Sequence, residues 1–167
     1  IDQVQDIEAN QERMTKDNLK SLTLTVKKMM EMKSEEYNGK IPPSARDELL
    51  DKIAEIDVGE TGYVYIVGAT EERNENYPNV SALNNNLGHY VLSKDRERDG
   101  EDIYNAQAPN GEYIVQQIIE RGENTSEGEV AFYRYPWKNP SDPKPRDKIA
   151  ALTYYEEWDV VIGASSY

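Results

Sequence analysis

The sequence has 167 residues, with 32 acidic and 19 basic side chains and a formal net charge of -13. This length fits one domain, and a charge of this sign and size repels nucleic-acid phosphates, which excludes a nucleic-acid partner. The absence of cysteine excludes disulfides, thiolate nucleophiles and zinc–thiolate sites.

The chain opens with a long amphipathic helical pattern over residues 1–37. Its apolar residues recur at steps of three, four, seven or eight, and no glycine or proline interrupts them; they are Val4, Ile7, Met14, Leu22, Val26 and Met29. At about 1.5 Å per residue this helix is roughly 50 Å long, more than a compact domain of this size needs. We therefore expect one end to project or to continue toward another element.

A second, shorter helix is expected after a break. Asn38-Gly39 and Pro42-Pro43 end the first helix. Ser44 and Asp47, three residues apart, resemble a capping box that opens a helix running through Ile56.

The sequence then takes on the character of strands. The segment from Gly62 to Val67 is aromatic and β-branched, which predicts a strand. A long polar loop from Ala69 to Gly88 separates it from a second short strand from His89 to Leu92. A helical pattern follows over residues 113–119 and is closed by Gly122.

Three further strands are expected at the end of the chain: Glu129 to Trp137, Lys148 to Tyr155 and Asp159 to Ser165. Their short connections suit antiparallel hairpins. The predicted fold class is α+β, a five-stranded antiparallel sheet with a long N-terminal amphipathic helix and short helices over one face. Residues 62–167 make up the predicted sheet core.

Five parts of this pattern stand out together: Gly62-Tyr63-Val64-Tyr65-Ile66, Gly100 with Asn110-Gly111, Gly128-Glu129-Val130-Ala131-Phe132-Tyr133, Lys148, and Trp158-Asp159-Val160-Val161-Ile162-Gly163. They resemble the single-Cache family, type 2, over roughly residues 19–167. The resemblance implies one PAS-like sensor domain spanning residues 1–167, outside the membrane in a chemotaxis receptor or sensor kinase. It also implies membrane contact through flanking helices and a homodimeric full receptor. Because the sequence stops at Tyr167 directly after an apolar strand, we expect it to be a domain excised from a longer receptor.

The resemblance has departures. The polar segment from Ala69 to Gly88 replaces a short turn, Ser93-Lys94 stands where relatives carry His-Pro, and Ala151 stands where a tyrosine often follows the family lysine. We expect a reshaped pocket, so ligand identity does not carry over directly. The family typically binds short organic acids, of the acetate, lactate, propionate or pyruvate class.

Strand alternation predicts where such a pocket would lie. Residues two apart share a face, so tyrosines and a tryptophan on one strand can face a lysine on the next. Five basic residues also gather between Arg134 and Lys148, in a protein that is otherwise acidic. An ammonium or guanidinium group among phenol donors suits a small carboxylate. The expected ligand-binding residues are Tyr133, Tyr135, Trp137, Arg146, Lys148 and Tyr154. Solvated loop cations and ordinary strand aromatics are the competing interpretation.

No pattern indicates catalysis, a cofactor or a metal. His89 is the only histidine, and we interpret it as a strand-edge residue, so a triad or multi-histidine site cannot form. Asp95, Asp99 and Asp102 fail the spacing of a calcium loop. We interpret Trp158 as a core or membrane-proximal packing residue.

The sequence thus predicts an extracytoplasmic sensory domain that recognises a small organic acid and passes the signal across the membrane. Two alternatives stay open. One is a dimerisation or interaction module whose long helix pairs with another copy. The other is the sensor domain of a histidine kinase with a non-carboxylate ligand.

Overall fold

A computed structural model describes residues 2–69 and 87–167. The helices are α1 (Asp2–Glu36), α2 (Pro43–Ala54) and α3 (Ile114–Glu123). The strands are β1 (Tyr63–Gly68), β2 (Tyr90–Leu92), β3 (Ala131–Trp137), β4 (Arg146–Tyr155) and β5 (Val160–Ser166), with 3-10 turns η2 (Lys94–Arg96) and η3 (Glu156–Trp158). Each predicted helix and strand is present. Most of the predicted loop from Ala69 to Gly88 lies outside the described residues.

The five strands form one antiparallel sheet in the order β2-β1-β5-β4-β3. The hairpin of β3 and β4 pairs Tyr135 with Lys148, and the last strand, β5, lies between β4 and β1. The first strand in the chain therefore comes close to the last two. This strand order brings side chains that are 85 residues apart in sequence, Tyr63 and Lys148, into contact.

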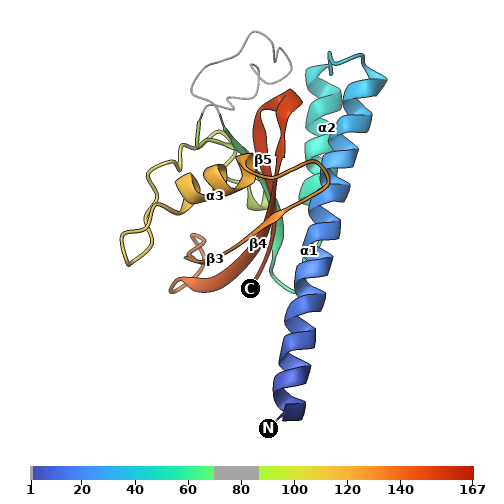
Figure 1. The fold of residues 1–167 in the computed structure, drawn as a ribbon. Helices are drawn as coiled ribbons and strands as arrows, with labels where there is room; N and C mark the ends of the chain where they lie inside the picture. The colour runs from blue at the N-terminus through green and yellow to red at the C-terminus, as the bar shows by residue number, and fades with distance from the viewer. Residues whose placement is uncertain (1, 70–86) are drawn as a thin grey trace.

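Helices cover both faces of the sheet, α1 and α2 on one side and α3 on the other (Figure 1). Strand alternation divides the side chains between the two cores. On β1, Val64 and Ile66 pack toward α1 and α2, whereas Tyr63 and Tyr65 pack toward α3. The predicted sheet and long helix are confirmed, and the two short helices lie on opposite faces.

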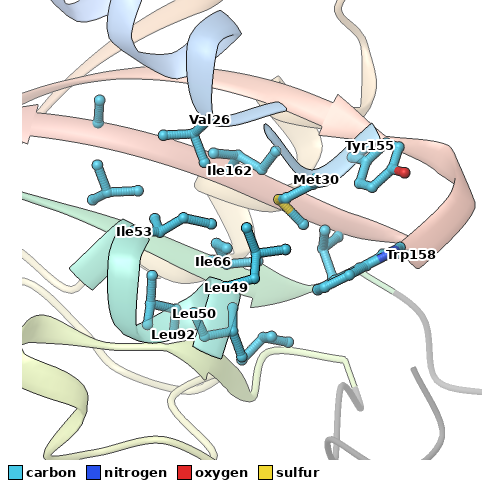
Figure 2. Packing of buried hydrophobic residues seen from close by; sticks show 14 of the residues in the cluster. Val26, Met30, Leu49, Leu50, Ile53, Ile66, Leu92, Tyr155, Trp158 and Ile162 are labelled. Carbon is cyan, nitrogen blue, oxygen red and sulfur yellow. The ribbon is translucent and has the colours of Figure 1, made fainter. Parts of the chain in front are cut away.

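The core beneath α1 and α2 is closely packed (Figure 2). Val26 and Met30 of α1 meet Ile162 of β5, and Leu50 of α2 is fully buried. Trp158, at the turn before β5, is fully buried in this cluster, which agrees with its interpretation as a core residue. This cluster is one of the two hydrophobic cores of the domain.

The start of α2 corrects the predicted capping box. Pro42 occupies the N-cap position without a side-chain hydrogen bond to the helix, and Pro43 begins the helix. The fixed φ of proline suits the first helical position, and its missing N–H would be unpaired there anyway. Ser44 and Asp47 therefore lie inside the helix and do not cap it.

The N-terminal part of α1 extends beyond the sheet, as its length predicts (Figure 1). Residues 2–14 are exposed, and the first fully buried side chain of the helix is that of Leu19. Across residues 2–69 and 87–167, no helix combines the length and apolar character that a bilayer-crossing segment requires.

Candidate ligand-binding site

A small cavity lies between the sheet and α3. Its walls come from strands β1 to β4, from α3 and from the segment between β2 and α3; the lining residues are Tyr65, Val67, Tyr90, Ile103, Val115, Ile118, Tyr135, Trp137 and Lys148. The side chains close tightly around it. The room left for the centre of a water molecule is about 10 Å³, roughly that of one water.

Lys148 is the one charged residue among those walls. Its position on β4, directly opposite Tyr135, turns its side chain inward, and it is only 3% exposed. The Nζ atom donates a hydrogen bond to the Tyr63 hydroxyl at 2.5 Å. Within the described residues, Nζ has no other hydrogen-bond partner and no carboxylate oxygen within 4.0 Å. An ammonium has three donors, so two of them lack a partner among the described residues.

Aromatic rings surround the Lys148 ammonium. Their centroids lie 3.9 Å (Tyr63), 5.2 Å (Tyr65), 5.7 Å (Tyr135), 5.6 Å (Trp137) and 5.5 Å (Tyr167) from Nζ. The negative faces of such rings attract a cation, but each contact contributes only about 0.5–2 kcal/mol. This is less than the several kcal/mol that burial of one ion costs. The cage therefore holds Lys148 in place without fully compensating its charge.

Hydrogen bonds fix the tyrosines of the cage. The Tyr63 hydroxyl donates to Oδ1 of the buried Asn139 at 3.1 Å, and Nδ2 of Asn139 donates to the Tyr167 hydroxyl at 2.7 Å. The hydroxyls of Tyr65 and Tyr135 lie 3.0 Å apart, so one donates to the other. The buried indole N–H of Trp137 has no acceptor in the part of the chain that the structure describes. An oxygen-rich ligand could accept from it.

Burial shifts the pKa values of these groups in opposite directions. Loss of water lowers the pKa of Lys148 well below its ordinary value, and the nearby cations Lys94 and Arg146 lower it further, while Asp142 raises it. Burial raises the pKa of Tyr63, Tyr65 and Tyr135 above the ordinary phenol value. The tyrosines therefore remain neutral donors throughout the physiological pH range.

Three of the six residues expected from the sequence line this cavity together: Tyr135, Trp137 and Lys148. Tyr133 lies beside them, with its ring 4.8 Å from that of Tyr135, but its hydroxyl donates to Glu112 and Arg121 stacks on its ring at 4.4 Å. It supports the wall without facing the cavity.

The other two expected residues lie outside the cavity. Arg146 is at the start of β4, where it stacks on Tyr167 at 3.7 Å and donates to Thr61. Tyr154 shares the face of Lys148, but six residues of strand at about 3.3 Å each separate the two by roughly 20 Å. Its hydroxyl donates to Asp159, and its side chain lines a different hollow beside α1.

The sequence prediction missed Tyr63, Tyr65, Tyr90, Asn139 and Tyr167. The alternating tyrosines of β1 were a usable signal, because Tyr63 and Tyr65 must share a face. Gly163 was another. A Cβ there would lie 2.5 Å from Cζ of Tyr65, so the glycine leaves space for the tyrosine ring to cross β5 toward β3.

The residues considered for metal binding have ordinary structural partners. His89 Nδ1 lies 3.0 Å from the carbonyl of Gly100, and Asp99 accepts from Ser93 and Arg96. Over the described ranges, no group of three or more acidic or histidine side chains is arranged to hold a metal ion.

The architecture and the cavity define a class of protein, a PAS-like small-molecule sensor domain. The sequence model of one family, the Cache 3/Cache 2 fusion domain, matches residues 41–167, and the chain belongs to this family. Cache domains are extracytoplasmic sensor domains of chemoreceptors. This chain accordingly has a ligand-sensing role outside the cytoplasm and is not an enzyme.

Solved structures with the same fold include proteins of bacterial chemotaxis. A periplasmic sensor domain of a chemotaxis protein has a TM-score of 0.68 and 17% identity, with 95% of this chain and 96% of that chain covered. A Cache chemosensory domain studied for carboxylic acid recognition has a TM-score of 0.70 and 14% identity, with 95% of this chain and 97% of that chain covered. A methyl-accepting chemotaxis protein from Vibrio parahaemolyticus RIMD 2210633 has a TM-score of 0.69 and 15% identity, with 100% of this chain and 97% of that chain covered. At these identities the likeness concerns the fold.

Proposed function

We propose that the cavity binds a small organic acid through its carboxylate, with Lys148 as the countercharge. The observation that carries this proposal is a buried ammonium with no acidic partner among the described residues. A buried charge is costly unless it is paired, and a carboxylate ligand would supply the missing partner.

The remaining walls match the rest of such a ligand. The indole N–H of Trp137, which has no acceptor among the described residues, is a donor for a carboxylate oxygen. Of Tyr65 and Tyr135, the hydroxyl that accepts the hydrogen bond between them keeps its own proton for a second oxygen. Val115 and Ile118 of α3 offer an apolar surface to a short hydrocarbon tail. Acetate, propionate, lactate and pyruvate fit this description. Carboxylic acid recognition by a Cache domain of the same fold supports the choice.

Binding would have to move the walls. The cavity has room for about one water molecule, so a ligand of several heavy atoms requires α3 or the aromatic side chains to shift outward. In this proposal that shift is the first step of signalling, since the ligand favours the open arrangement over the closed one.

The sheet offers a path from the cavity to α1. Along β4, Lys148 and Ala150 face the cavity side, whereas Ile149 and Ala151 pack in the core beneath α1. Thr23 of α1 also donates to the carbonyl of Ala151 at 3.3 Å. We propose that residues 1–167 act as one sensor domain of a transmembrane chemoreceptor. A ligand-induced change in the sheet would then displace the helix of residues 1–37 and, through it, flanking membrane segments.

A thermal-shift experiment tests the proposed ligand class. Sodium acetate, propionate, lactate and pyruvate are compared with sodium chloride at matched ionic strength. At 100 times Kd a ligand stabilises the folded state by about 2.7 kcal/mol, which corresponds to about 5–10 °C in a domain of this size. At least one acid should raise the Tm of the native protein.

Two variants make this result specific. Lys148→Ala should not respond, whereas Lys138→Ala, which removes an exposed lysine of the same region, should respond like the native protein. A flat response of the native protein to all four acids, or an equal response of Lys148→Ala, would refute the proposed ligand class.

A second function, self-association through α1, is favoured by one observation. Val4, Ile7 and Met14 are 59%, 56% and 68% exposed on the part of α1 that extends beyond the sheet. Their spacing of three and seven residues is that of a coiled-coil seam, which a parallel α1 from a second copy would bury. Analytical ultracentrifugation should show a dimer that Ile7→Glu weakens and that Gln5→Glu, an exposed polar change away from this seam, does not. A monomer at all concentrations, or equal effects of the two changes, would argue against it.

A further inference from the structure

No acidic side chain among the described residues lines the cavity or pairs with Lys148. β1 presents Tyr63 and Tyr65, β3 presents Tyr135 and Trp137, β2 presents Tyr90, and α3 presents aliphatic side chains; Tyr167 completes the cage. The described charged groups that act on the pKa of Lys148 are Lys94 of η2, Arg146 of β4 and Asp142 of the loop between β3 and β4. Asp142 already pairs with Arg146 at 3.6 Å. Two of these three influences are positive.

The phenols cannot supply the missing charge. Tyr63 donates its proton to Asn139, and one of Tyr65 and Tyr135 donates to the other, so all three phenols are hydrogen-bonded in the neutral state. Burial raises the pKa of all three, which makes a tyrosinate less accessible still. In the absence of a ligand, the simplest way to remove the uncompensated charge is to release the ammonium proton.

We propose that carboxylate binding at this site is coupled to the uptake of one proton by Lys148. The inference rests on the proposed function and adds its regulation. In the empty cavity Lys148 is largely a neutral amine that donates one hydrogen bond to the Tyr63 hydroxyl. When the anion enters, Nζ takes one proton from solution, and an ammonium–carboxylate pair forms in the cage. The site thus takes up an anion together with a proton.

This coupling fixes how affinity depends on pH. The bound site carries one more proton than the empty site, so affinity falls as pH rises. Above the pKa of Lys148 in the empty protein, the apparent Kd should increase about tenfold per pH unit, and below it the apparent Kd should be constant. A cell with such a receptor would respond to a given acid concentration more strongly in acidic surroundings.

Calorimetric titration with sodium acetate tests the coupling. Titrations at several pH values from about 6 to 9.5, in phosphate and in Tris, separate buffer ionisation from binding because the two buffers have different protonation enthalpies. We expect proton uptake that rises toward one per site with increasing pH, together with the rise in apparent Kd. Acetate binding with no proton uptake at any pH would overturn the inference and leave the proposed function standing. Failure of acetate, propionate, lactate and pyruvate to bind at any pH would overturn both.

A variant and a second measurement complete the test. Arginine remains charged at all these pH values, so any acetate binding by Lys148→Arg should show no proton uptake. Because the larger guanidinium of this variant could crowd the cage, the native protein is also labelled with ¹³C at the lysine side chains and titrated by NMR. The Lys148 signal should titrate at a higher pH with acetate than without it. Equal midpoints would overturn the inference.

Discussion

Replacement of Lys148 by methionine should stabilise the domain while it abolishes ligand binding. Methionine is unbranched and flexible, so it can follow the path of the lysine stem between the rings. The Tyr63 hydroxyl keeps its hydrogen bond to Asn139, so the change leaves no buried donor unpaired. The variant therefore isolates the cost of the buried amine.

The magnitude follows from two opposing effects. Burial of an ammonium costs several kcal/mol, and the aromatic cage and one hydrogen bond recover only part of it. We expect Lys148→Met to raise the free energy of unfolding by about 1–3 kcal/mol near pH 7. Each kcal/mol shifts the Tm of a domain of this size by about 2–4 °C. The expected rise is therefore about 2–12 °C.

The difference between the two proteins should depend on pH in one direction. The pKa of Lys148 is lower in the folded state than in the unfolded chain, where it is about 10.4. Between these two values the unfolded native chain binds more protons, so native stability rises with pH. The advantage of Lys148→Met should be constant below the folded pKa and shrink as pH approaches about 10. Urea unfolding of both proteins from about pH 6 to 10 measures it. A variant that is less stable than the native protein throughout would refute the claim that this lysine is uncompensated.

Two further changes probe the packing on each side of the sheet. Gly163→Ala should destabilise the domain by about 1–3 kcal/mol and weaken the acetate response, because a Cβ there lies 2.5 Å from Cζ of Tyr65; unchanged melting and titration curves would show that Tyr65 is not held by this contact. Trp158→Ala should cost about 3–5 kcal/mol in urea unfolding, since the side chain is fully buried beneath α1 and α2. A loss below about 1 kcal/mol would contradict the described core.

The fold was largely predictable because its signals are local. Runs such as the one from Tyr63 to Val67 combine β-branched and aromatic residues between glycines, and the predicted strands begin and end within two residues of the observed ones. The capping box was wrong for an equally local reason. Ser44 and Asp47 have the right spacing, but the N-cap is Pro42, two residues before Ser44, and the helix begins at Pro43.

The site was only partly predictable because its contacts are not local. Tyr135 and Lys148 belong to one hairpin, so their pairing follows from the turn and from strand alternation. Tyr63 and Tyr65 reach Lys148 only because β5 inserts between β1 and β4, and no short pattern encodes that strand order. Arg146 lies two residues before Lys148 and so shares its face of the strand. As the first residue of β4, however, it contacts Tyr167 and Thr61 and does not line the cavity.

A crystal structure of the native protein grown with the acid that gives the largest thermal shift tests the central claim most directly. We expect electron density for the ligand between the sheet and α3, with a carboxylate oxygen within hydrogen-bonding distance of Lys148 Nζ and the surrounding side chains moved outward. Ligand density elsewhere, with Lys148 still held only by Tyr63 in a closed cage, would contradict the account.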